Sequence, residues 1–82
     1  MDELHLELPD GRVFQGSPVA VVAQMRSLAF EREESLESYI RWSCQQARAH
    51  LGIEIAAEGD TLSALASSFL DSVVRAGLAA RR

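Results

Sequence analysis

The chain of 82 residues contains no lysine, so all eight of its basic residues are arginines. Twelve acidic residues outnumber them, and the formal net charge at pH 7 is −4. This balance argues against broad binding to nucleic acids or anionic membranes, because both of those surfaces are negatively charged. The arginine bias and the abundant alanine are typical of a GC-rich genome.

Cysteine occurs only once, at Cys44, which excludes a disulfide framework. No run of 18 apolar residues is present, so no segment is predicted to span a membrane. The first ten residues are acidic and alternate in hydrophobicity, unlike a secretory signal peptide. We therefore expect a cytoplasmic protein in which Cys44 is reduced.

Residues suited to catalysis or metal binding are also scarce. Cys44 and His50 are the obvious nucleophile and base, but on one helix they lie about 120° apart around the axis and about 9 Å apart along it. His5 is the only other histidine, and no carboxylate stands near either histidine at the spacing of a metal motif. The five glycines are isolated, which excludes a glycine-rich phosphate loop. We expect a protein that is not an enzyme and has no metal, cofactor or small-molecule substrate.

Residues 3–16 predict a β-hairpin. The first strand alternates leucines with polar residues, as a half-buried strand does. A Pro-Asp-Gly sequence at 9–11 then fits a type I turn followed by a left-handed residue, which closes a three-residue loop. This turn pairs Leu6 with Phe14, so Phe14 joins the leucine face and Val13 lies on the outer face.

Helical periodicity predicts three helices after the hairpin, over residues 17–30, 35–51 and 61–76. Ser17 and Ser35 are suited to cap the first two helices, and either Asp60 or Thr61 the third. One helix could also run through the acidic residues 31–34, but we prefer a break there, because an unbroken helix could not fold back on itself.

The ends of the last two helices are predicted at Gly52 and Gly77, where glycine can take the left-handed conformation of a C-cap. Residues 53–55 alternate and form either a short third strand or a packed connection. We therefore predict one small α+β domain over residues 1–82. Its element order is ββαα(β)α, with the helices packed on the leucine face of the hairpin.

The second predicted helix carries a broad apolar stripe of Leu36, Tyr39, Ile40, Ser43, Cys44, Ala47 and Leu51. Trp42 lies about 120° from the centre of this stripe, at 100° per residue. Either another protein covers Trp42, or the three helices wrap around it and bury it internally. Both alternatives stay open at this stage.

Four apolar side chains fall off the main faces of their elements: Trp42, Val13, Leu70 and Val74. Together they predict an exposed patch of interface size, and tryptophan is strongly enriched at binding hot spots. So short a chain is only marginally stable alone, which makes a second copy the simplest partner. We expect a protein-interaction module, such as an adaptor, regulator or assembly subunit, that forms a homodimer or higher homo-oligomer.

The alternative is a small dimeric DNA-binding regulator of the transcriptional or antitoxin type, because a strand followed by two helices also occurs in such proteins. The arginines argue against it, since they are spread over every element instead of one face: Arg12, Arg26, Arg32, Arg41, Arg48 and Arg75. Only Gln15 on the outer side of the hairpin is suited to contact bases.

Overall fold

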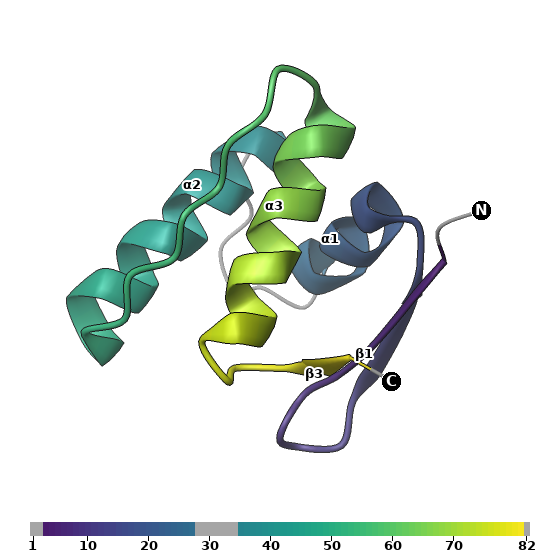
Figure 1. Ribbon diagram of the computed structural model, residues 1–82, viewed down its shortest axis with the longest axis horizontal. Helices are drawn as coiled ribbons and strands as arrows, with labels where there is room; N and C mark the ends of the chain where they lie inside the picture. The colour runs from purple at the N-terminus through teal and green to yellow at the C-terminus, as the bar shows by residue number, and fades with distance from the viewer. Residues whose placement is uncertain (1–2, 28–34, 82) are drawn as a thin grey trace.

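A β-hairpin and three helices follow one another in the computed structural model, which describes residues 3–27 and 35–81. The order of elements is β1 (Leu4–Glu7), β2 (Val13–Gly16), α1 (Pro18–Ser27), α2 (Leu36–Gln46), a π-helical turn η1 (Ala47–Leu51), α3 (Leu62–Arg75) and β3 (Ala80–Arg81). The helices lie on one side of a small antiparallel sheet, and α3 lies between α1 and α2 (Figure 1). The predicted α+β class is therefore confirmed.

The hairpin has the register that its sequence predicts. Leu6 pairs with Phe14 and Leu4 pairs with Gly16. The turn closes through a 2.9 Å hydrogen bond from the Gly11 amide to the Leu8 carbonyl, and Gly11 has a φ of 93°, in the left-handed region. Leu6 and Phe14 are buried against the helices, whereas Val13 on the outer face is exposed.

The third strand is not where the sequence analysis placed it. Residues 53–55 form no strand, and β3 instead pairs antiparallel with β1 through Glu7 opposite Ala80 and Leu6 opposite Arg81. Residues 53–60 instead run back along α2 to the start of α3 (Figure 1), and the Ser72 hydroxyl of α3 donates to the Ala56 carbonyl over 2.6 Å.

The predicted N-cap of α1 is confirmed. The Ala20 amide donates to the Ser17 hydroxyl over 3.2 Å, and Pro18 takes the first helical position. The predicted end of this helix at residue 30, and the acidic connector at 31–34, lie outside the described residues.

Helix α1 also contacts the outer edge of β2. Phe14 and Gly16 form their backbone bonds toward β1, so the carbonyl of Gln15 between them points away from β1. The side-chain amide of Gln24 in α1 donates to that carbonyl over 2.8 Å. This contact joins the helix to the sheet without using an apolar side chain.

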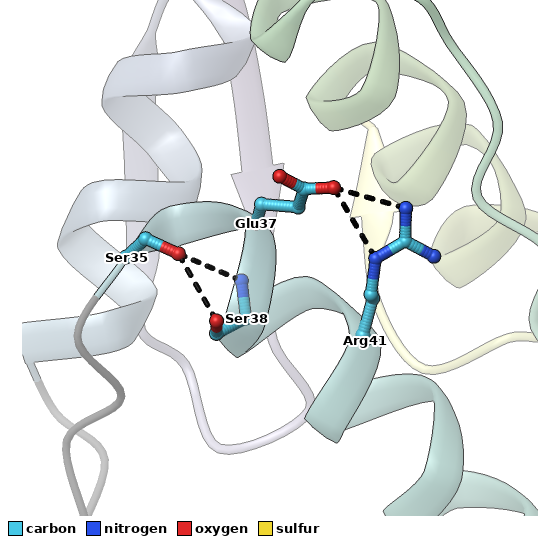
Figure 2. Close-up of polar contacts among 4 residues, drawn as sticks. All are labelled: Ser35, Glu37, Ser38 and Arg41. Atoms are coloured by element: carbon cyan, nitrogen blue, oxygen red, sulfur yellow. Dashed lines mark hydrogen bonds and ion pairs between the residues drawn. The ribbon is translucent and has the colours of Figure 1, made fainter.

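Helix α2 begins at its own cap. Ser35 is extended, with a φ of −134°, and its hydroxyl accepts from the Ser38 amide over 3.1 Å (Figure 2). The predicted break before this helix is therefore confirmed. One turn further on, Arg41 and Glu37 form the expected i,i+4 ion pair at 3.0 Å.

Thr61 is the N-cap of α3, which decides between the two predicted candidates: its hydroxyl accepts from the Ala64 amide over 3.1 Å. We expect Thr61→Ala to lower the free energy of unfolding by about 1 kcal/mol, because an amide loses its partner. We expect Asp60→Ala to change it by about 0.5 kcal/mol or less, as at an ordinary surface position. Urea unfolding of both variants measures the difference, and equal losses would contradict the assignment.

The other end of α3 closes with the two bonds of a Schellman cap. The Leu78 amide donates to the Val73 carbonyl over 3.1 Å, and the Gly77 amide to the Val74 carbonyl over 3.0 Å. Gly77 has a φ of 80°, as predicted for a C-cap. The cap redirects the chain from the helix to β3, which then lies beside β1.

The core lies where α3 meets the other two helices and the sheet. Its largest fully buried side chains are Phe69, Leu6, Ile40, Leu70, Val21 and Val22. Every described helix and both strands of the hairpin supply buried side chains to this one core. Within residues 3–27 and 35–81, no helix has the length and apolar character needed to cross a membrane.

Candidate functional site

The four side chains predicted to form an exposed patch occupy different environments. Leu70 is fully buried, so its prediction as a surface residue is wrong. The reason is that α3 packs against α1 on one side and α2 on the other, which covers residues beyond its main apolar stripe. Val74 is partly buried against the core, and Val13 is 50% exposed on β2.

Trp42 is partly buried. It is neither enclosed by the three helices nor left fully exposed for another protein to cover. It packs on the core, and its ring centroid lies 6.0 Å from that of Tyr39 with the planes tilted by 34°. It also lines a groove on the protein surface, and it is the only one of the four predicted residues that does so.

The groove has a volume of about 400 Å³, which falls in the range of binding pockets. Its lining comes from every described helix, the turn after β1, residues 53–60 and the turn after α3: Leu8, Met25, Tyr39, Trp42, Ser43, Gln46, Ala47, His50, Leu51, Ile55, Phe69, Val73 and Leu78. Nine of these thirteen side chains are apolar, the exceptions being Tyr39, Ser43, Gln46 and His50. The groove therefore presents mainly apolar surface to solvent.

The π turn η1 forms one lip of the groove. The Gly52 amide donates to the Ala47 carbonyl, five residues back, and Gly52 has a φ of 66° as predicted for the end of this helix. Helical periodicity predicts Leu51 on the buried stripe, but the wider π turn moves it off that stripe and leaves it 57% exposed. Single π turns occur frequently at functional sites, so this lip is a candidate contact surface.

The residues described along the groove carry little charge. Their titratable side chains are those of Tyr39 and His50, and none of them is a carboxylate. Burial raises the pKa of the Tyr39 hydroxyl, although its hydrogen bond with Ser43 offsets part of the rise. Tyr39 therefore stays neutral at physiological pH, and the groove is suited to an apolar partner.

Several arginines are paired with carboxylates on the exposed surface. The pairs are Arg12 with Asp10 at 3.2 Å, Arg41 with Glu37 at 3.0 Å, and Arg75 with Asp71 at 2.8 Å. Arg81 also lies 3.9 Å from Asp71. A nucleic-acid phosphate would have to compete with these carboxylates, and the pairs lie on different elements.

Cys44 is partly buried beside the core. Burial raises the pKa of its thiol, and the nearby Arg41 guanidinium offsets part of that rise. A raised pKa leaves little thiolate at neutral pH, which does not suit a nucleophile. In the parts of the chain that the structure describes, no three His, Cys, Asp or Glu side chains gather as they would around a metal ion.

Sequence reasoning found Trp42 but missed most of the groove. Leu8 follows β1, Met25 lies in α1 and Leu78 follows α3, and only the tertiary packing brings them to one opening. The periodicity of the second helix even placed Leu51 on the wrong side, because it assumes a regular α-helix throughout. Comparison of the chain with protein-family models, with curated proteins and with solved structures found no match in any of the three.

Proposed function

We propose that this chain is a non-enzymatic protein-interaction module, such as a small adaptor, regulator or assembly subunit, which binds its partner in the groove. The observation that carries the proposal is the largely apolar groove with Trp42 in its wall and Leu51 exposed at its lip. Removing apolar surface of this kind from water favours association with a partner.

A protein partner fits this groove better than a phosphorylated or charged ligand does. The described residues of the lining include no carboxylate and no arginine for an ion pair, and three of its polar side chains lie together on α2 and η1: Ser43, Gln46 and His50. Apolar side chains on a helix or loop of the partner would pack against Tyr39 and Trp42. The polar side chains would hydrogen-bond to the partner's backbone beside them.

The arginine pairs do not favour the DNA-binding alternative. Arg12, Arg41 and Arg75 each have a carboxylate within 3.2 Å, so phosphate contacts would need these pairs to break. Together with the net charge of −4, this makes a duplex DNA partner the weaker candidate.

Photo-crosslinking in the native host tests the proposal. A photoreactive residue replaces Gln46 in the groove, and in a matched control it replaces Ser63, which is exposed near the start of α3 and outside the groove. We expect one adduct of discrete mass from position 46 and none of that mass from position 63. Equal labelling at both positions, or none at position 46, would contradict the proposal.

The crosslinked protein is then identified, purified and titrated with the purified chain. We expect Trp42→Ala to weaken this binding about 30-fold, the loss typical of an aromatic hot spot. Trp42→Phe keeps an aromatic ring in the wall and should weaken it less. Circular dichroism confirms that both variants are folded, and unchanged affinity in a folded Trp42→Ala would refute the role of the groove.

A further inference from the structure

We infer that the turn at the end of α2 exchanges between a π-helical and an α-helical register, and that this exchange moves Leu51 between the groove and a second cavity. The structure holds the π-helical register, in which the Gly52 amide donates to the Ala47 carbonyl. The Ile53 amide donates to the same carbonyl over 3.2 Å. In the α-helical register, that carbonyl accepts from the Leu51 amide, four residues on. The two registers therefore share one acceptor and differ by one residue in the donor.

The two registers point Leu51 to opposite sides of Ala47. In a regular α-helix, Leu51 lies within about 20° of Cys44, seven residues earlier. A π turn holds one residue more, which turns Leu51 back by up to about 100°, toward the side of Ser43 and Gln46. The structure agrees with this geometry, because Leu51 lines the groove with Ser43 and Gln46 and does not line the cavities beside Cys44.

A cavity beside Cys44 has room for the leucine side chain. It has a volume of about 150 Å³, and its lining residues are Cys44, Gln45, Arg48, Glu54 and Ile55. A side chain on an α-helix leans toward the N-terminal end of the helix, so in the α-helical register Leu51 lies beside Arg48 in the wall of this cavity. Ile55 lines both the groove and the cavity, so the exchange carries Leu51 from one side of Ile55 to the other.

Each register has an advantage that the other lacks. In the π-helical register, Gly52 has a φ of 66°, which suits the end of a helix, but the Leu51 side chain is 57% exposed. The α-helical register removes more of that side chain from water, and it requires Gly52 and the connection after it to move. Residues 53–60 form no helix or strand, so this connection can take up a shift of one residue.

The exchange affects the groove because Leu51 forms its lip in the π-helical register only. A protein bound in the groove contacts Leu51 in that register, so binding shifts the population toward it. This link to binding rests on the proposed function, whereas the exchange itself depends only on the end of the helix and the cavity beside it.

NMR relaxation dispersion of the full chain tests the exchange, because helix register shifts occur in the μs–ms range that this method measures. We expect a minor register populated at about 1–10% in the unmodified chain. The amides of residues 47–55 and the methyl groups of Leu51 and Ile55 should show the dispersion, because Leu51 changes place and Ile55 borders both places.

Deletion of Ala49 removes the additional residue of the π turn. The Gly52 amide is then four residues from the Ala47 carbonyl, so an α turn ends at Gly52 with Leu51 still at the groove. Only one register remains, and the dispersion should be lost.

Leu51→Ser covers the case in which the deletion variant does not fold. Leu51 is largely exposed, so its replacement should not disturb the fold, and a serine gains little from entering the cavity. The dispersion should be lost in this variant as well. Leu62→Ser is the matched control, because it replaces a leucine of α3 that is 41% exposed and lines neither opening. It should keep the dispersion of the unmodified chain.

The outcomes separate the inference from the proposed function. No dispersion in the unmodified chain, or its persistence in the Ala49 deletion or in Leu51→Ser, would overturn the register exchange. Dispersion with the expected pattern but no crosslink from position 46 would support the exchange and contradict the proposed function. A discrete crosslink from position 46 without dispersion would do the reverse.

Discussion

Replacing Leu70 with alanine is expected to lower the free energy of unfolding by about 2–5 kcal/mol, the usual cost of truncating a buried leucine. Leu70 has no exposed surface and packs in the core with Phe69 and Leu6. A domain of 82 residues has a total stability of about 4–12 kcal/mol, so this single change removes a large part of it. Urea unfolding of the purified variant measures the loss.

Leu62→Ala is the matched control, because it makes the same substitution in the same helix at a side chain that is 41% exposed. Its expected cost is about 1 kcal/mol or less. The sequence alone placed Leu70 on the surface, and a surface leucine would give the same small loss in both variants. Equal losses would therefore contradict the buried position of Leu70.

Gly59→Ala is expected to lower the free energy of unfolding by about 1–3 kcal/mol through overpacking. A Cβ atom at position 59 would lie 2.5 Å from the backbone nitrogen of Leu65 and 2.7 Å from the carbonyl carbon of Ala64. Both atoms belong to the backbone of α3, which cannot rotate away as a side chain would. The backbone around Gly59 and the first turn of α3 must therefore move away from each other.

The control for this prediction is Glu58→Ala, one residue earlier in the same segment. Glu58 is exposed, and its backbone amide keeps its 3.1 Å hydrogen bond to the Ser68 hydroxyl after the substitution. We expect a change of about 0.5 kcal/mol or less. Thermal unfolding compares the two variants, and a Gly59→Ala chain as stable as the Glu58→Ala chain would show that the close approach is absent.

Local chemistry made much of the fold predictable from sequence. The hairpin register follows from the turn at 9–11 and the leucine alternation, and Ser17, Ser35 and Gly77 mark helix ends that the structure confirms. Each of these signals depends on residues within one turn or one strand pair. A local preference is reliable when the surrounding fold agrees with it.

The errors arose where distant segments decide the outcome. Residues 53–55 alternate like a strand, but they run along α2 instead of joining the sheet, and β3 takes the place beside β1 (Figure 1). Strand pairing of this kind depends on where the Schellman cap at Gly77 directs the chain. Periodicity does not contain that information.

The candidate site was predictable only in part. Trp42 was singled out because it lies off the apolar stripe, and it does line the groove. The position of Leu51 could not be predicted, because the switch from α-helical to π-helical bonding at Ala47 has no distinct sequence signal. Leu8 and Leu78 reach the groove only through the packing of the sheet against α3.

The hydrogen bond from Gln24 to the Gln15 carbonyl interrupts the row of backbone groups along the outer edge of β2. A long uninterrupted row is the template on which chains stack into cross-β fibrils. The opposite edge of the sheet is β3, which has only two residues. Another chain that paired along this edge of the folded protein would first have to break the bond from the Gln24 amide.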